Sequence, residues 1–310
     1  MNRLLDLQDK IRTTGAALGK LEAELPLYPQ SRGLQSNILS LRRVHHDLER
    51  EFAQAADAVG LDVCHYRLLQ DRPSAKALAD SIHWFQDALA VAYDALRNGP
   101  KKIMSVAPAI AAQVELQTAY AYPGSFGIVF TIPNERMLIP DMQSYLDKAT
   151  ETVLALGKAQ DSKAPIIEAE HKLGRATIRA IYGWAHANAF HKTGAAVEWR
   201  RSDSVRRETI IQAPEFVALS ESLDRISRTE EITITPAGTL VGADTKYKTF
   251  HFVTVNDEDM RGRFSDVISE SQAAQLPGRY IAVLRKTTQI SYATEEEKSS
   301  YFLEGLESLR

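Results

Sequence analysis

The sequence predicts an α+β protein with a helical hairpin at one end and a small β-barrel at the other. Two observations support this prediction. In the first 59 residues, apolar side chains recur with alternating spacings of three and four, the heptad period of helices that pack lengthwise. From residue 229 onward, short segments of alternating polarity separated by turn residues indicate strands. The region between them carries both patterns, which predicts a domain of mixed helices and strands.

The heptad pattern is interrupted at Pro26, Pro29 and Gly33, so the chain is expected to fold back there. In the resulting antiparallel pair, the numbers of the two facing core residues add up to 59 in every layer. The apolar layers are Leu4 with Ala55, Leu7 with Phe52, Ile11 with Leu48, Leu18 with Leu41 and Leu25 with Leu34. Two antiparallel helices of equal rise require such a constant sum. One polar layer, Thr14 with His45, is expected to fix the register.

Residues 61–69 favour a strand, and a third helix is expected to begin after Ser74 and to end at Asn98. Its apolar residues again keep heptad spacing, so residues 1–100 are predicted to form one domain in which this helix lies along the hairpin. A mixed middle domain is predicted for residues 101–228. Its strands are expected at 114–122, 126–132, 196–200 and 208–212, and its helices at 141–156, 165–190 and 214–226.

Residues 229–310 are predicted to form a small β-barrel of SH3-like or OB-like type, because closure hides the edges of short strands. Strands are expected at 232–241, 247–255, 260–264, 280–286, 289–292 and 301–303, and a short helix at 267–276. The stretch Gly238–Asp244, continued through Phe250–Phe252 to Arg261–Phe264, resembles the small β-barrels appended to many uncharacterised bacterial proteins. This resemblance implies a component of a bacterial defence system.

Composition sets limits on the function. The chain of 310 residues has 37 basic and 40 acidic side chains, and a net charge of −3 argues against a surface coated for non-specific nucleic-acid binding. No apolar run approaches the ~20 residues that a membrane span needs, so a cytosolic protein without a membrane partner is expected. The single cysteine, Cys64, excludes an internal disulfide and a cysteine-rich zinc site. No metal and no cofactor are predicted.

The strongest candidate for a binding site is a run of arginines beside a tryptophan. Guanidinium groups bind phosphate through two parallel hydrogen bonds, and an indole can stack on a base, so this pattern predicts a site for a nucleotide or a single strand. Interleaved acids, Glu198, Asp203 and Glu208, support the alternative of a salt-bridged β-hairpin. The predicted binding residues are Trp199, Arg200, Arg201, Arg206 and Arg207, with Arg261 and Arg263 of the barrel as a smaller second group.

One enzymatic pattern competes with this interpretation. Asp141 follows a proline, and Glu170 and Lys172 follow later, in the order of a metal-dependent nuclease of the PD…ExK type. Such a site needs two acids for Mg²⁺ and a lysine that orients the attacking water. Asp141 sits where a helix N-cap is expected and Glu170 lies in a helix-favouring run, whereas nuclease acids lie on adjacent strands.

A non-enzymatic function is therefore favoured. The sequence predicts an assembly or recognition subunit that forms homo-oligomers through its helical end. The middle domain and the barrel are expected to bind a protein partner, a peptide or a nucleic acid. The metal-dependent nuclease and the bacterial defence component remain the two alternatives.

Overall fold

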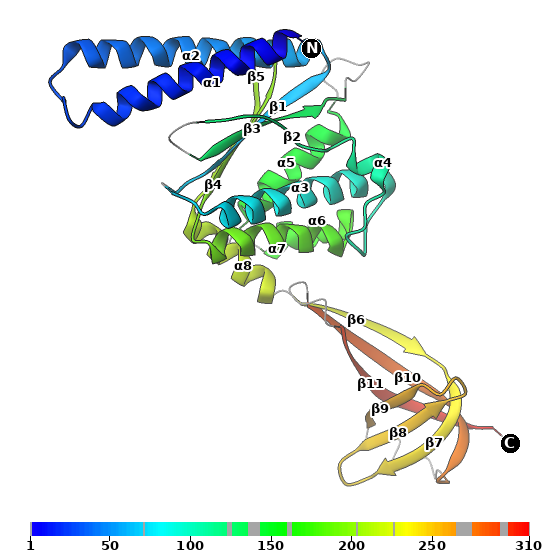
Figure 1. The fold of residues 1–310 in the computed structure, drawn as a ribbon. Helices are drawn as coiled ribbons and strands as arrows, with labels where there is room; N and C mark the ends of the chain where they lie inside the picture. Colours follow the sequence, from blue (N-terminus) through cyan, green and yellow to red (C-terminus); the bar gives the residue numbers. More distant parts are fainter. Residues whose placement is uncertain are drawn as a thin grey trace. The chain divides into compact units, whose positions relative to one another are not determined.

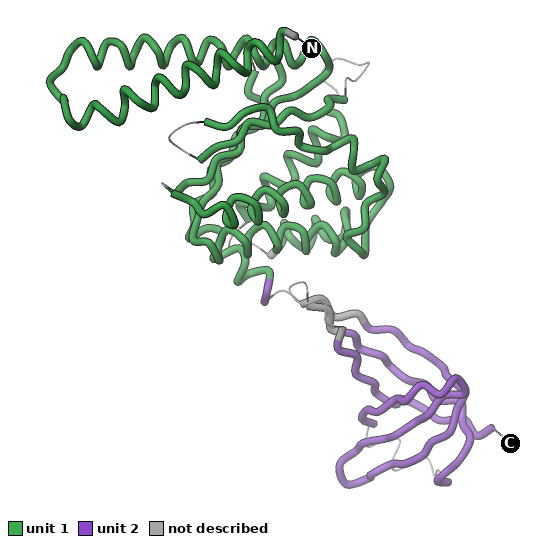
Figure 2. Tube along the Cα trace, viewed as in Figure 1, with its two compact units in different colours: residues 1–223 green, residues 224–310 purple. Residues whose placement is uncertain are grey.

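In the computed structural model, the chain forms two compact units, Met1–Leu223 and Asp224–Arg310 (Figure 2). The described residues are 2–70, 72–122, 126–135, 143–159, 163–202, 204–225, 227–264, 275–291 and 297–309. Residue 100, the predicted end of a helical domain, is not a boundary between compact units. The reason is that the strand at Leu61–Leu68 joins the sheet of the middle region.

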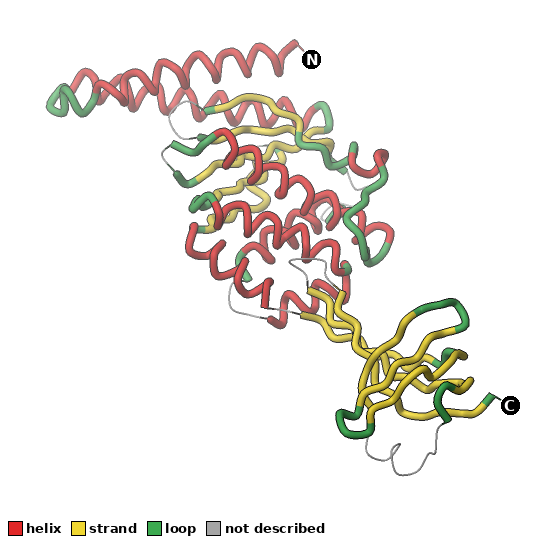
Figure 3. Tube along the Cα trace, turned by 60° about the horizontal axis from the view of Figure 1, so that its bottom comes forward, coloured by secondary structure: helices red, strands yellow, loops and turns green. Residues whose placement is uncertain are grey.

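The first unit has three layers, in which a sheet lies between a helical hairpin and a second group of helices (Figures 1 and 3). Its helices are α1 (Asn2–Glu24), α2 (Arg32–Ala58), α3 (Ala75–Asn98), α4 (Pro108–Ala111), α5 (Tyr145–Gly157), α6 (Lys163–Leu173), α7 (Arg175–Phe190) and α8 (Ala213–Arg225). Its strands are β1 (Leu61–Leu68), β2 (Gln117–Ala121), β3 (Gly127–Pro133), β4 (Ala195–Arg201) and β5 (Ser204–Ile211). They are antiparallel, in the order β2-β3-β1-β4-β5.

The predicted helical hairpin is confirmed, because α1 and α2 pack against each other in opposite directions (Figure 1). Leu7, Ile11 and Phe52 are buried, as their heptad positions predict. They share one apolar core with Val63 of β1 and Val129 of β3. This core fixes one end of the hairpin to the face of the sheet.

The two polar side chains of the predicted Thr14–His45 layer each contact their own helix. The Thr14 hydroxyl donates to the Lys10 carbonyl, a bond typical of threonine inside a helix. His45 Nε2 lies 3.5 Å from Glu49 Oε1, one turn further along α2. Thr14 and His45 therefore make these contacts within their own helices, each to a residue one turn away.

Helix α3 packs against α7 and α5 on the opposite face of the sheet from the hairpin, which differs from the predicted three-helix unit. Every residue from Ala88 to Ala95 is buried. A helix that is buried on all sides needs cover all round, and a place between the sheet and α7 supplies it. Ser74 begins this helix as its N-cap and accepts a hydrogen bond from the amide of Ala77.

The helix predicted over 165–190 is two helices, α6 and α7, which are separated by Gly174. This glycine has φ +87°, a value that favours residues without a side chain. The loop after α3 inserts at the break. Lys101 N donates to Leu173 O at 2.8 Å, and Ala176 N donates to Lys101 O at 3.1 Å. These two bonds take over backbone groups that a continuous helix would pair internally.

The second unit is the predicted small β-barrel. Five strands close into a ring in the order β10-β7-β8-β9-β11, and β11 pairs with β10 again. Its strands are β6 (Ser227–Ile234), β7 (Ala237–Asp244), β8 (Thr249–Thr254), β9 (Asp259–Phe264), β10 (Gly278–Ser291) and β11 (Glu297–Ser308). Phe250, Phe252 and Leu284 lie in its core. The run predicted as one strand at 232–241 divides at Pro236, whereas the two strands predicted at 280–292 form one, β10. The helix predicted at 267–276 lies almost entirely outside the described residues.

Candidate arginine-lined binding site

The predicted arginine cluster lies on β4 and β5 of the first unit, and the alternation of a strand divides it between two faces. Trp199 and Arg201 point toward the helices α3, α5 and α7, whereas Arg200 points toward the hairpin. Arg200 bonds to Glu198 on that face. The four arginines therefore do not form one continuous patch.

Trp199 has a structural position. Its side chain is 1% exposed, so a base cannot stack on its ring. The indole Nε1 donates to Asp62 Oδ2 at 3.0 Å. Asp62 lies on β1, next to β4, and is fully buried. The pair explains how a carboxylate and an indole N–H remain satisfied inside the protein.

Arg201 binds the same carboxylate through two hydrogen bonds. Its Nε lies 2.8 Å from Asp62 Oδ1 and its Nη2 lies 2.8 Å from Asp62 Oδ2. Nη2 also contacts Asp147 Oδ1 of α5 at 3.0 Å. The hydrogen bonds to Asp62, together with the charges of both carboxylates, raise the pKa of Arg201. The buried carboxylate and the half-buried guanidinium are thus each held with a partner, which keeps the guanidinium in one orientation.

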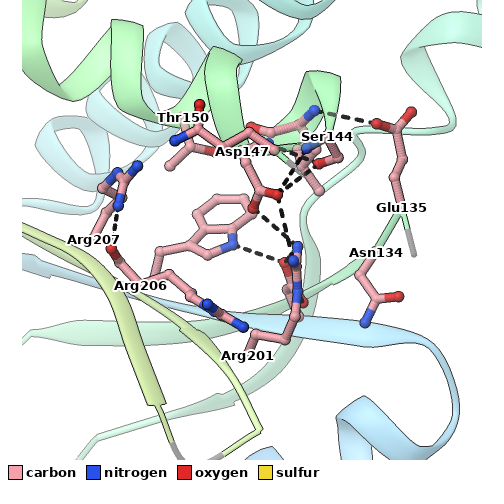
Figure 4. Close-up of polar contacts among 12 residues, drawn as sticks. Asn134, Glu135, Ser144, Asp147, Thr150, Arg201, Arg206 and Arg207 are labelled. Carbon is pink, nitrogen blue, oxygen red and sulfur yellow. Dashed lines mark hydrogen bonds and ion pairs between the residues drawn. The ribbon is translucent and has the colours of Figure 1, made fainter. Parts of the chain in front are cut away.

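Asp147 is positioned by the start of α5. Ser144 is the N-cap, and Asp147 N donates to Ser144 Oγ at 3.0 Å while Ser144 N donates to Asp147 Oδ2 at 3.0 Å. Burial alone would raise the pKa of Asp147, but the Ser144 amide and the charge of Arg201 hold it below its usual value. Glu135 accepts the amide hydrogen of Tyr145 at 3.0 Å, as Figure 4 shows. The sequence prediction placed the cap at Asp141, which lies outside the described residues.

A cavity of about 270 Å³ opens beside this network. It is lined by Gln143, Asp147, Thr150, Trp199, Arg201, Arg206 and Arg207. Figure 4 shows Arg201, Arg206 and Arg207 around one space below α5. Three of the predicted arginines therefore meet at a single site, with Trp199 as part of its wall.

A β-bulge brings Arg206 and Arg207 to the same cavity. Trp199 pairs with Arg207 and Arg200 pairs with Val205, so Arg206 is the additional residue on β5. In a regular strand, two consecutive side chains would point to opposite faces. Alternation in the sequence could not predict this arrangement.

The two arginines differ in their partners. Arg207 Nη2 lies 2.5 Å from Glu151 Oε2, and this bond lowers the pKa of Glu151. Arg207 Nη1 donates to the carbonyl of Arg206 at 2.8 Å. The Arg206 side chain is exposed, and among the described residues no carboxylate pairs with it. Arg206 is thus available to an anion from solution.

The smaller predicted group lies on β9 of the barrel. Arg261 Nη2 contacts Asp259 Oδ2 at 3.0 Å, and His251 Nε2 contacts the other oxygen of Asp259 at 2.7 Å. Arg263 is exposed. The acid of this strand therefore neutralises part of the predicted basic group.

Of the three residues in the nuclease pattern, the structure describes Glu170 and Lys172, whereas Asp141 lies outside the described residues. Glu170 and Lys172 both lie on α6, where Glu170 is 7% exposed and takes part in contacts. Lys172 Nζ pairs with Glu168 Oε1 at 2.6 Å. Within the described ranges, no group of three histidine, cysteine, aspartate or glutamate side chains is arranged to hold a metal ion.

The chain was compared with known proteins in three ways. No family model, no curated protein and no solved structure matches this chain. In the part of the chain that the structure describes, no helix combines the length and the apolar character that crossing a bilayer would require.

Proposed function

We propose that the protein is a cytosolic, non-enzymatic recognition subunit that binds a phosphate-bearing ligand, a nucleotide or a nucleic-acid strand, at the arginine-lined cavity. The observation that supports this most is the convergence of Arg201, Arg206 and Arg207 on one space, with Arg206 open to solvent. Planar guanidinium groups bind phosphate oxygens through paired hydrogen bonds.

The three arginines are expected to contribute to binding in different ways. Arg201 is held in place by Asp62 and Asp147, whose two charges offset its own, so it forms a fixed part of the wall and is not the main source of positive potential. Arg207 is held by Glu151 at an exposed position, and a phosphate can compete with that carboxylate. Arg206 has no competing acid among the described residues and is expected to make the first contact.

Charge reversal at the rim tests this proposal. The double variant Arg206→Glu/Arg207→Glu leaves the contacts of Arg201 with Asp62 and Asp147 unchanged, so it is expected to fold and to lose binding. With a fluorescein-labelled 20-nucleotide single strand of DNA or RNA, affinity should fall at least about tenfold, because two phosphate contacts are replaced by repulsion. For the parent protein, the logarithm of affinity should decrease linearly with the logarithm of salt concentration, and the variant should have a slope smaller by about 1.4, since each phosphate contact on a single strand contributes about 0.7.

The control is Arg72→Glu/Lys102→Glu, which changes the net charge equally at two exposed positions away from the cavity. Inorganic phosphate and ATP as competitors separate a preference for nucleotides from one for strands. If the rim variant and the control bind all of these ligands alike, recognition at this cavity is excluded.

Self-association through the helical end is the second part of the proposal. The hairpin leaves apolar side chains in solvent, with Leu5 55%, Leu39 65% and Val44 49% exposed. A second copy that packs on this surface would cover them, as in a four-helix bundle. Light scattering at micromolar concentration is expected to give twice the 34.5 kDa mass of the chain, and Leu39→Glu/Val44→Glu is expected to return it to one. A monomeric parent protein contradicts self-association.

The metal-dependent nuclease and the bacterial defence component stay predictions. Cleavage of single- and double-stranded substrates with Mg²⁺, compared between the parent and Lys172→Ala, would decide the first.

A further inference from the structure

A second cavity lies on the other face of the sheet, between the hairpin and strands β1, β4 and β5. It has a volume of about 330 Å³. At the docked end of the hairpin, Leu7, Ile11 and Phe52 fill the space between helix and sheet. At the cavity, α1 presents Gly15 and Gly19 instead, one turn apart. Glycine destabilises a helix interior relative to alanine, so these two residues keep space open at a cost to the helix.

Carboxylates gather around this space. Glu198 and Glu208 lie directly opposite each other on β4 and β5, an arrangement that is unfavourable for like charges. Glu49 reaches the cavity from α2, and Glu22 from α1. Burial alone would raise the pKa of Glu49, but its hydrogen bond to His45 and the nearby cations lower it, so this carboxylate is ionised at neutral pH.

The cations nearby do not balance these acids. Arg42 Nη2 pairs with Glu22 Oε1 at 2.6 Å, and Arg200 pairs with Glu198. Arg67 lines the cavity as a single guanidinium against the two remaining carboxylates, Glu49 and Glu208. Among the described residues, Glu208 has no cationic partner. The cavity therefore has an excess of negative charge.

Two histidines and a tyrosine supply the other polar groups of the wall. His65 Nδ1 bonds to the Tyr122 hydroxyl, and burial lowers the pKa of His65, so its ring is neutral and does not repel a cation. His45 Nε2 faces Glu49, whereas His45 Nδ1 is buried and has no hydrogen-bond partner among the described residues. The Nδ1 atom is covered by neighbouring atoms, so it is not open to a ligand in the cavity.

From the excess of carboxylates around this space and from the room left by two glycines, we infer that this cavity binds a small aliphatic ammonium group. Tyr122 adds an aromatic side chain to the wall, and a cation can interact favourably with such a ring. The aliphatic part of the ligand would contact Leu18 and the glycine surface of α1. This site lies on the opposite face of the sheet from the arginine-lined cavity and has the opposite charge preference.

Calorimetry with 1,4-diaminobutane and n-butylamine at pH 7.5 tests this inference, with n-butanol and butyrate as ligands of similar size without the positive charge. Both amines are expected to bind the parent protein, and the alcohol and the acid are not. Glu208→Gln should weaken amine binding about tenfold, because a charge-assisted contact is lost. Glu51→Gln, an exposed change on the outer side of α2, should leave it unchanged.

Gly19→Leu is expected to fill the cavity and to abolish amine binding, while the thermal midpoint of the free protein stays the same or rises, because leucine favours a helix. If this variant fails to fold, Glu208→Gln alone decides. Nα-acetyl-lysine amide serves as a third ligand, because it represents a lysine side chain of a partner protein. A site that accepts only free amines will not bind this compound. No binding of either amine at millimolar concentration, equal binding of n-butanol, or unchanged binding by Glu208→Gln overturns the inference.

Discussion

Replacement of Asp62 with alanine is expected to lower the free energy of unfolding by about 3–5 kcal/mol, the typical cost of removing one member of a buried ion pair. Asp62 accepts two hydrogen bonds from Arg201 and the indole hydrogen bond of Trp199, and it is fully buried. Without it, Asp147 is the one carboxylate among the described residues that still pairs with the guanidinium, and the indole N–H loses its partner. Urea denaturation followed by circular dichroism measures the loss.

Glu51→Ala serves as the matched control, because it also removes a carboxylate but from an exposed position on α2. Its effect should stay within about 0.5 kcal/mol, as is usual for surface substitutions. A loss below about 1 kcal/mol for Asp62→Ala would contradict a structural role for the network, since a half-buried cation short of one partner and a buried indole N–H without one cost more than that.

Gly174→Ala is expected to cost roughly 3 kcal/mol or more, from backbone strain and overpacking together. A Cβ at this position would lie 2.2 Å from the carbonyl oxygen of Lys101 and 2.4 Å from its amide nitrogen. These are backbone atoms held by hydrogen bonds to Leu173 and Ala176, so they have little room to move. The backbone of Gly174, at φ +87° and ψ 166°, is also in a region that is essentially limited to glycine.

Gly33→Ala tests the same substitution where nothing opposes it. No heavy atom lies within 4 Å of the added methyl group, and the residue is in the first turn of α2. This variant should match the parent or exceed it by up to about 1 kcal/mol, since alanine favours a helix. Thermal and urea unfolding of both variants should therefore diverge strongly. Equal stability of the two would show that the contact at Lys101 does not constrain the break between α6 and α7.

The parts of the fold that depend on local periodicity could be predicted from the sequence. The hairpin is an example, because Leu7, Ile11 and Phe52 are buried where their heptad spacing places them. The small barrel is another, since its core alternates along each strand, as at Phe250 and Phe252.

Features that depend on distant contacts could not be predicted. Nothing near Gly174 in the sequence reveals that the Lys101 loop will insert beside it. The heptad of α3 indicates a packed helix but does not say against which partner, and α7 lies far along the chain.

The sequence predicted several residues of the arginine-lined site but not how they are arranged in space. Alternation along β4 separates Arg200 from Arg201, which a strand assignment already implies. The bulge that adds Arg206 to the same face as Arg207 depends on how β5 pairs with β4. The cap at Ser144 had a signal that the prediction did not use, a serine followed three residues later by an acid. The buried partner of Arg201, Asp62, gave none, because it is more than one hundred residues away in sequence.

The strand order also sets when the first unit can be completed during synthesis. Strand β1 lies between β3 and β4, and β4 does not end until Arg201. At the usual rate of ~5–20 residues per second, a ribosome needs roughly 7 to 27 seconds after β1 before its second neighbour is complete. Throughout that interval, the hairpin can form from local contacts, whereas the edge of β1 that will meet β4 stays open to other strands or to a chaperone.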